Sequence, residues 1–518
     1  MSITSASFLA VLVALLVLAL AVYALRRLFA LPDISNRAQA PARPLAKDTD
    51  LGRAVSRDMI RNPGKTGVVP LLDAKAAFAY RLAMVDKAQV SIDVQYYIWR
   101  DDVSGLLLID ALRRAAKRGV KVRLLLDDIG ISGVDPYIAA LTNAPNFDVR
   151  LFNPSTARNP KLLSFAFDFM RMNRRMHNKS LIVDGAAAII GGRNIGDEYS
   201  QTNSDLFFLD LDVLVTGVIV SDISQMFAAY WNCLSAYEAD LIIPGPGDPD
   251  RLNRKIADLA DQPAAQEFRE TAAQIVSDLA TQEEGLEWTD VQLLADDPAK
   301  GRGGARRDQL MVSRLVPILA GVETRLDLMS AYFVPGKPGR KAFSKLAKSG
   351  KTVNVLTNAI DTTDVLLVHS GYTKYRRALL KSGVTLFELK RQDDDTEGKD
   401  HFLPLGLSGT SLHAKTFAID DARIFIGSFN FDMRSAMLNC EMGVLIESPT
   451  LARRMREAFD TRIALSAYRP ALSPSGKLVW HEDLPNGGRR VHKGEPGATL
   501  WQRMVLAIIG RLPVEWLL

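Results

Sequence analysis

Cysteine and histidine are scarce in this chain of 518 residues: cysteine occurs twice and histidine six times. Cys233 and Cys440 are too few for a disulfide framework, and neither belongs to a CxxC metal-binding pair. The fold therefore does not require an oxidising compartment. The formal net charge of +5 and a pI near 9.0 give a mild basic bias. This bias suits anionic partners such as lipid headgroups or nucleic acid, and it selects neither.

Charge is absent from a long stretch near the N-terminus. Residues 8–25 form an apolar run of 18 residues that ends at Arg26 and Arg27. That length is about the minimum for a helix that crosses a bilayer. A cleaved signal peptide would carry a basic segment before the apolar run, and residues 1–7 contain no Lys or Arg. We therefore expect a transmembrane anchor over residues 1–30, and the basic residues after it place the main body in the cytoplasm.

The remaining chain contains one structural unit twice. In the first copy, apolar periodicity predicts a strand, a helix and a strand, over residues 88–99, 105–119 and 120–128. The same order returns over residues 325–335, 339–350 and 351–359. This alternation predicts parallel βαβ units, and hence the α/β class.

A constant offset shows that the copies arose by duplication. Tyr96 and Tyr332 are 236 residues apart, and so are His177 and His413. We expect a juxtamembrane linker over 31–70, and two domains joined by a partly helical linker that begins at "PGPGDP", with a C-terminal extension that either lies in the membrane interface or packs on the second domain. The expected ranges are 71–243 for the first domain, 244–310 for the interdomain linker, 311–470 for the second domain and 471–518 for the extension.

Each copy carries the pattern HxK(x)4D on an apolar strand. Side chains two positions apart share a face of a strand, so the histidine and lysine of each motif point together. The aspartate lies seven positions beyond the histidine, where it is typical of a turn between two strands. The motif residues are His177, Lys179 and Asp184 in the first copy and His413, Lys415 and Asp420 in the second. The residues that follow are Gly191, Gly192 and Asn194 in the first copy and Gly427, Ser428 and Asn430 in the second.

These residue types indicate a phosphate site. Lysine binds phosphate oxygens as a point charge, and the asparagine amide and serine hydroxyl can donate to the same oxygens. A neutral imidazole can attack phosphorus while a second, protonated imidazole donates to the leaving oxygen. One motif supplies half of this machinery, and two facing motifs supply all of it. Each histidine also needs an orienting carboxylate, and the candidates are Asp210 and Glu441, with Asp212 and Asp205 as alternatives for the first copy.

The duplicated motif resembles the phospholipase D superfamily, and the chain is most similar to the bacterial cardiolipin synthases of the C-type branch. The similarity extends to "GGRNIGDEY", "FLDLDVLVTG" and the final "LPVEWLL". It implies two similar α/β domains with central mixed sheets around a pseudo-two-fold axis, and a site at their junction. It also implies a phosphohistidine intermediate without metal or cofactor, with the six motif residues as the catalytic set. His177 is then the nucleophile and His413 the acid/base, although the residues alone leave the reverse assignment open. Gly192, where the second copy has Ser428, implies one phosphate donor fewer in the first copy.

The resemblance implies a phosphatidyltransferase that moves a phosphatidyl group to phosphatidylglycerol, with phosphatidylethanolamine as an alternative donor. The expected location is the bacterial inner membrane, with a single span. A phospholipase D hydrolase would share every catalytic residue and use water as the acceptor. A membrane-anchored nuclease is disfavoured because no basic tract interleaved with aromatic residues suits single strands, so no nucleic-acid partner is expected. A catalytically silent membrane scaffold is the last alternative, and nothing in the chain indicates a protein partner.

Two charged clusters have simpler explanations. The acidic run 391–398 is predicted to be a solvated loop and not a metal site, because no second oxygen cluster accompanies it. Arg171, Arg174 and Arg175 form either a solvated face or an attraction site for anionic headgroups.

Overall fold

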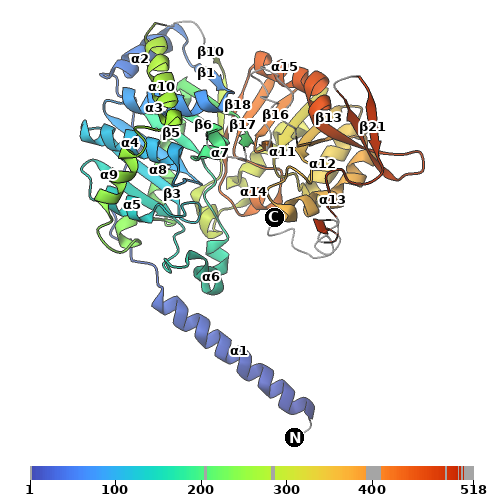
Figure 1. Cartoon of the computed structure of the whole chain (residues 1–518), viewed down its shortest axis with the longest axis horizontal. Helices are drawn as coiled ribbons and strands as arrows, with labels where there is room; N and C mark the ends of the chain where they lie inside the picture. Colours follow the sequence, from blue (N-terminus) through green and yellow to red (C-terminus); the bar gives the residue numbers. More distant parts are fainter. Residues whose placement is uncertain are drawn as a thin grey trace.

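The computed structural model describes residues 3–202, 207–281, 286–391, 410–484 and 487–499, together with 501, 502, 504 and 506. In this part of the chain, two α/β domains lie side by side and α1 projects from one end of the first (Figure 1). The first domain contains a nine-stranded sheet and the second a ten-stranded sheet. Both sheets mix parallel and antiparallel pairs. The predicted fold class is confirmed.

The first sheet has the strand order β10-β1-β8-β6-β5-β2-β3-β4-β9. Its parallel centre consists of β2 (Ser91–Tyr96), β3 (Lys121–Asp127) and β4 (Phe147–Phe152). Antiparallel strands continue the sheet beyond β2: β5 (Ser180–Val183), β6 (Ala187–Gly191), β8 (Asp212–Gly217) and β1 (Thr66–Leu71). The expected βαβ unit is β2, α4 (Val103–Lys117) and β3.

The second sheet repeats this order strand for strand. The series β18-β17-β16-β12-β13-β14 corresponds to β8-β6-β5-β2-β3-β4. Its parallel centre is β12 (Arg325–Ser330), β13 (Thr352–Asn358) and β14 (Thr385–Leu389). The antiparallel part is β16 (Lys415–Ile419), β17 (Arg423–Gly427) and β18 (Met442–Ile446). The repeated topology explains the constant sequence offset.

Local sequence accounts for these elements. Strand β3 is buried along its whole length after Lys121, as expected for a parallel strand covered on both faces. Helix α4 begins where the Asp102 side chain accepts a hydrogen bond from the amide of Gly105. Helix α3 (Ala74–Lys87) begins in the same way at Asp73. The capping aspartates and the apolar faces that follow them place both helices against the first sheet.

The two domains share one apolar core, which fixes their relative position. Side chains from β6 and β8 of the first domain belong to the same buried cluster as side chains from β17 and β18 of the second. Helix α8 (Ile219–Asn232) contributes to this cluster. Its members include Ile190, Val213, Val215, Ile223, Phe227, Ile424, Ile426, Met442 and Val444. Burial of apolar surface on this scale joins the domains into one body.

Strands outside the expected domain ranges complete both sheets. After α9 (Pro249–Ala257) and α10 (Pro263–Thr281), β10 (Glu287–Thr289) pairs with β1 and β11 (Val291–Ala295) pairs with β18. The chain thus passes from the edge of one sheet to the edge of the other near residue 290. Beyond residue 470, β19 (Ala467–Leu472), β20 (Leu478–Asp483) and β21 (Arg489–His492) extend the second sheet. The exact domain boundaries stay a prediction, and most of the C-terminal 501–518 lies outside the described residues.

Other helices cover the sheets or form short turns. Those of the first domain include α2 (Asp50–Arg61), α5 (Asp135–Leu141), α6 (Ser164–Met172) and α7 (Asp197–Ser200). Those after the first domain include α11 (Met311–Ala320), α12 (Gly336–Lys348), α13 (Leu366–Lys381), α14 (Met433–Met437), α15 (Pro449–Glu457) and α16 (Ile463–Ser466).

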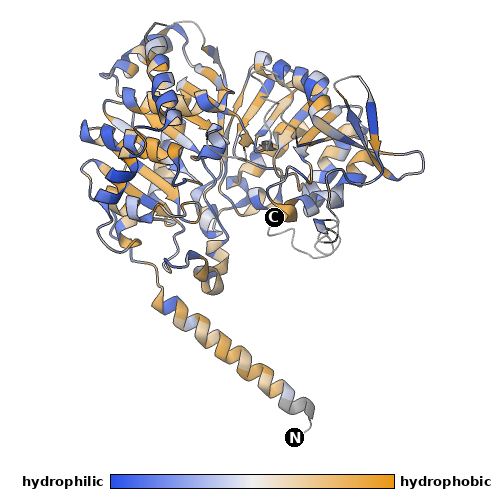
Figure 2. Ribbon diagram, in the orientation of Figure 1, coloured by the Kyte–Doolittle hydropathy of each residue, from blue (hydrophilic) through white to orange (hydrophobic). Residues whose placement is uncertain are grey.

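Helix α1 (Ile3–Leu28) stands apart from the domains and is apolar along most of its length (Figure 2). Its residues Ser7–Leu28 have a mean hydropathy of 3.0, and none of that surface is buried against the protein. The helix is long and apolar enough to cross a membrane. A free-standing apolar helix of this kind indicates membrane association.

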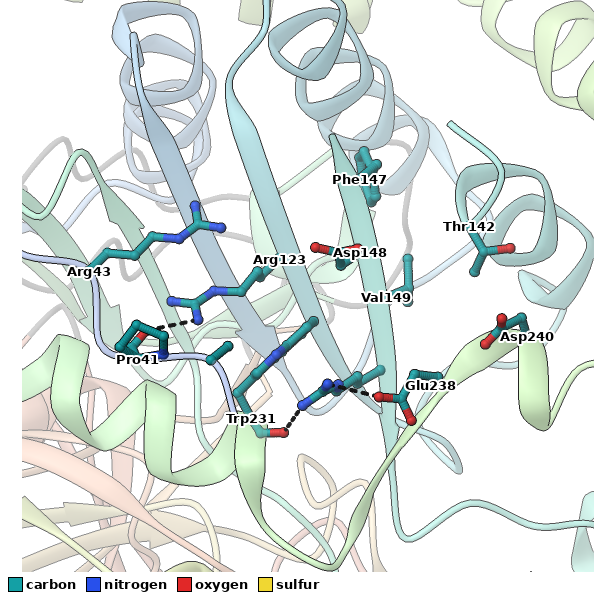
Figure 3. A pocket seen from close by; sticks show the side chains of 12 residues that line it. Pro41, Arg43, Arg123, Thr142, Phe147, Asp148, Val149, Trp231, Glu238 and Asp240 are labelled. Atoms are coloured by element: carbon teal, nitrogen blue, oxygen red, sulfur yellow. Dashed lines mark hydrogen bonds and ion pairs between the residues drawn. The ribbon is translucent and has the colours of Figure 1, made fainter. Parts of the chain in front are cut away.

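The segment after α1 is packed on the first domain. Its Arg37 donates to the carbonyl of Asn232 at 2.7 Å, and the amide of Ala46 donates to the carbonyl of Asp184 at 2.9 Å. Figure 3 shows a cavity of about 460 Å³ here, where Arg123 donates to the carbonyl of Pro41 at 3.2 Å. The arginines of this cavity are neutralised by the protein itself, since Arg123 and Arg150 pair with Asp93 and Glu238. The expected juxtamembrane linker therefore docks on the sheet it precedes.

Candidate active site

Two short backbone pairings cross the seam between the domains. Strand β7 (Phe207–Leu209) of the first domain pairs in parallel with β15 (Thr410–Leu412) of the second. A matching bridge joins Met176 to Cys440. As a result, the amide of His413 donates to the carbonyl of Leu209 at 2.8 Å, and the amide of His177 donates to that of Cys440 at 2.8 Å. Each motif histidine is positioned by the backbone of the other domain.

The orienting carboxylates are exchanged between the domains. Nδ1 of His177 lies 2.8 Å from Oε2 of Glu441, which follows the second motif. Nδ1 of His413 lies 2.5 Å from Oδ2 of Asp210, which follows the first. Of the two alternatives considered for the first copy, Asp212 pairs with Arg81 at 2.8 Å, and Asp205 lies outside the described residues. Neither domain therefore contains a complete histidine–carboxylate pair of its own.

The two lysines lie beside the histidines, as their spacing on the strands predicts. Nζ of Lys179 donates to the carbonyl of His177 at 2.8 Å. Nζ of Lys415 lies 2.8 Å from Nδ1 of His413 and also donates to the carbonyl of that residue. Both ammonium groups are buried. The site therefore holds two cations in a space of low polarity, where a bound anion would stabilise them.

Burial and charge set the protonation states of this cluster. Burial, with the charges of Lys179 and Lys415, lowers the pKa of His177 and of His413 well below the usual range. Each lysine thus acts on both histidines, which is the electrostatic signature of one shared site. Burial lowers the pKa of Lys179 to about 7 and raises the pKa of Glu441 to about 7. Near neutral pH, both imidazoles are uncharged in the absence of substrate.

The contacts of His177 fix its tautomer. Its Nδ1 faces Oε2 of Glu441 and, at 3.2 Å, the carbonyl of Ser428. Because a carbonyl can only accept, Nδ1 carries the proton and Nε2 keeps its lone pair. Nδ1 of His413 instead contacts one carboxylate and one ammonium. The two rings are therefore not equivalent, and His177 is the one prepared to act as a nucleophile.

Gly192 and Ser428 differ because of the carboxylates and not because of a phosphate. A Cβ at Gly192 would collide with the carboxylate of Asp210. The hydroxyl of Ser428 donates to Oε2 of Glu441 at 2.5 Å. The expectation that the first copy has one phosphate donor fewer is thus wrong in its premise, since Ser428 is already engaged. Asn194 and Asn430 accept hydrogen bonds from the amides of Ile98 and Tyr332, at 3.2 and 3.3 Å, and so hold the loops after β2 and β12.

Asp184 and Asp420 lie at the far ends of the motif strands. Both have a positive φ, 52° and 55°, and begin the turn that follows. The carboxylate of Asp184 accepts from the amides of residues 89, 90 and 91, and that of Asp420 from the amides of residues 323, 324 and 325. Seven residues of strand separate each aspartate from its histidine by roughly 23 Å. These two members of the expected catalytic set stabilise turns and do not share the histidine cluster.

Several residues of the site carry no signal in the sequence. The ring of Tyr97 packs edge-on against His177 with centroids 5.0 Å apart. Tyr199 and Phe208 pack against His413 at 5.2 and 5.1 Å. Asp296, from the expected linker, accepts the amide of Glu441 at 2.9 Å. Only the packing of distant segments brings these residues to the seam, and the acidic run 392–398 lies outside the described residues.

The fold and the site define a class of protein: a duplicated α/β enzyme with one phosphate-transfer site shared between its halves. Residues 82–231 and 315–463 match the family "Cardiolipin synthase, PLD-like domain". The chain therefore belongs to the phospholipase D-like family, which confirms the resemblance drawn from the duplicated motif.

Relatives with curated names agree with this assignment. The chain is 41% identical to "Cardiolipin synthase C" of Escherichia coli (strain K12) over 461 residues, which cover 88% of this chain and 97% of the relative. It is 25% identical to "Cardiolipin synthase" of Clostridium perfringens (strain SM101 / Type A), over 79% of this chain and 74% of the relative. The crystal structure of phosphatidylserine synthase from Haemophilus influenzae Rd KW20 shares the fold, with a TM-score of 0.54 and 13% identity, over 90% of this chain and 99% of that one. The names of these proteins indicate phospholipid substrates.

Exchanging residues between positions 192 and 428 tests the role of the carboxylates. We expect Gly192→Ser to lower the free energy of unfolding by about 1–3 kcal/mol and to reduce turnover, because it displaces Asp210 from His413. The reciprocal Ser428→Gly should cost only about 1 kcal/mol, through one lost hydrogen bond. Thermal unfolding and initial rates measure both effects. Equal losses in the two variants would contradict this explanation.

Replacing the turn aspartates tests their structural role. Asp184→Ala should cost about 3 kcal/mol, because a buried carboxylate is removed from three amides. Asp420→Ala should cost about 1–2 kcal/mol, because water can reach its partly exposed site. Denaturant unfolding measures stability, and turnover per folded molecule should stay within about threefold of the parent. A large loss of turnover in fully folded protein would return these residues to the catalytic set.

Proposed function

We propose that this enzyme is a phosphatidyltransferase of the cardiolipin synthase type, which moves a phosphatidyl group to the headgroup hydroxyl of phosphatidylglycerol. The donor is a second phosphatidylglycerol or phosphatidylethanolamine. The observation that carries the proposal is the exchange of carboxylates, which gives one site two oriented histidines and two lysines. The 41% identity to a cardiolipin synthase over most of both chains supports this choice of reaction.

In the first half-reaction, we assign the attack to Nε2 of His177, whose lone pair is held available by Glu441. The phosphodiester anion lies between Lys179 and Lys415 and offsets the charges that lower the histidine pKa values. His413, stabilised as an imidazolium by Asp210, gives its proton to the departing alkoxide. The P–O bond to the donor headgroup breaks, and a P–N bond to His177 forms.

In the second half-reaction, the same groups act in reverse. The acceptor hydroxyl gives its proton to His413 while its oxygen attacks phosphorus, and the P–N bond to His177 breaks. The products are cardiolipin and the regenerated histidine pair. Burial of both histidines and both lysines favours an alcohol over water as acceptor, because little water reaches the phosphohistidine. A hydrolase would use the same residues with water in the second step.

We also propose that α1 is a single span in the bacterial inner membrane, with the two domains in the cytoplasm. Support comes from the basic residues that follow the apolar run: Arg26, Arg27, Arg37, Arg43 and Lys47.

Purified enzyme with labelled phosphatidylglycerol, with and without phosphatidylethanolamine, tests the reaction. We expect labelled cardiolipin, separated by chromatography, whereas phosphatidic acid alone would establish a hydrolase. His177→Ala and His413→Ala should each lose at least about 100-fold in turnover, because each ring moves a proton or forms the P–N bond. His481→Ala, on β20 of the second sheet, is the matched control and should retain activity. Cleavage of DNA without lipid turnover would replace the proposal with a nuclease.

The pH dependence of kcat/KM should be bell-shaped with both limbs near neutrality. As pH falls below about 7, Glu441 takes up a proton and no longer orients His177 as a carboxylate. As pH rises above about 7, Lys179 loses the proton that binds phosphate. Because the groups interact, the limbs report the site as a whole. Initial rates at low substrate concentration measure the profile, and a constant kcat/KM from about pH 5 to pH 9 would contradict these assignments.

A further inference from the structure

The segment of residues 161–172, here called the α6 segment, protrudes from the first domain beside the membrane helix. It consists of a short turn (Lys161–Leu163) and helix α6. Figure 1 places α6 at the end of the domain from which α1 extends. The rings of Phe29 and Phe167 stack with centroids 5.6 Å apart, and Nε of Arg26 donates to the carbonyl of Phe167 at 2.6 Å. The α6 segment is therefore attached to the last turn of α1.

This segment exposes an unusual concentration of large apolar side chains. Leu162 and Met170 are each 67% exposed, and Leu163 and Phe169 are also exposed. In the described chain between residues 30 and 499, thirteen large apolar side chains are exposed, and four of them lie in these few residues. A single exposed leucine needs no explanation, but a contiguous apolar patch on a soluble surface indicates an interaction site.

Basic side chains border the apolar patch. Arg171, Arg174 and Arg302 line a cavity of about 470 Å³ together with Met170 and Leu31. Arg171 is paired with Asp168, whereas Arg174 donates to the carbonyls of Lys300 and Met437. Among the described residues, Arg174 and Arg302 have no carboxylate partner, so their charges are available to an anion. By contrast, Arg175 is buried in an ion pair with Asp127 and belongs to the fold.

We propose that the α6 segment is a second membrane contact, which lies in the interfacial layer of the same bilayer that α1 crosses. Leu162, Phe169 and Met170 enter the headgroup–acyl boundary, and Arg174 and Arg302 face anionic phospholipid headgroups. The evidence is continuity with α1 and the combination of exposed apolar and basic side chains. The alternative explanation of the arginine cluster as a solvated face then applies to none of its members.

The contact has a consequence for the site. Met172 ends α6, and five residues later the chain reaches His177, a span of roughly 17 Å at most. A bilayer contact at α6 therefore orients the seam toward the membrane surface, where a flexible tether at α1 alone would leave the domains free to rotate.

Depth-dependent fluorescence quenching tests the proposal in the full chain. Met170→Cys carries an environment-sensitive maleimide dye, Ile60→Cys is the control, and Leu28→Cys at the end of α1 is the reference. Ile60 is 81% exposed on α2, at the opposite end of the domain from α1 (Figure 1). Native thiols interfere little, because Cys440 is buried and burial raises the pKa of Cys233 to about 11. The labelled proteins are reconstituted into vesicles of phosphatidylcholine and phosphatidylglycerol that contain nitroxide-labelled acyl chains.

We expect the dye at position 170 to be quenched several-fold more than the dye at position 60, and to a degree close to that at position 28. Quenching at 170 no greater than at 60 would overturn the proposal. In vesicles without phosphatidylglycerol, quenching at 170 should fall while that at 28 stays constant, and Arg174→Gln with Arg302→Gln should have the same effect. No response to either change would overturn the headgroup contact. Because the readout needs no turnover, its failure is distinct from failure of the proposed reaction.

Discussion

The exchange of carboxylates across the domain seam is the interaction on which this structure depends. A histidine buried beside a lysine in a single domain would have no acceptor for its second ring nitrogen. Glu441 and Asp210 supply that acceptor from the opposite domain. The duplication is thus more than a doubling of parts, because each half completes the other. Separation of the domains would leave buried charges without partners, which costs far more than the loss of a surface ion pair.

Much of the surrounding architecture holds this exchange in place. The shared apolar core fixes the sheets, and the β7–β15 pairing and the Met176–Cys440 bridge set the height of each histidine on the seam. Asp296 holds the backbone of Glu441 from the segment that joins the sheets. The same rigid arrangement keeps two ammonium groups dry, so that binding of a phosphodiester is what relieves the electrostatic cost of the empty site.

The sequence alone predicts the repeated strands and the pairing of histidine with lysine, because both depend on local periodicity. The offset of 236 residues likewise predicts the matching strand orders. The crossing of the carboxylates could not be predicted, since it depends on how two domains pack, and spacing along one strand carries no such information. Equivalent positions also diverge: Tyr96 is buried against Arg81, whereas Tyr332 donates to Asp364. In the cluster Arg171, Arg174 and Arg175, only the fold separates a core ion pair from two residues at the surface cavity.

The tautomer of His177 tests the central claim most directly. The ring nitrogens of histidine, labelled with 15N in the full chain, report by NMR which nitrogen carries the proton, and His177→Gln assigns the signal. At neutral pH the account predicts a neutral ring with the proton on Nδ1, and loss of this preference when Glu441, in the other domain, is replaced by alanine. A protonated ring, a proton on Nε2, or a signal indifferent to residue 441 would contradict it.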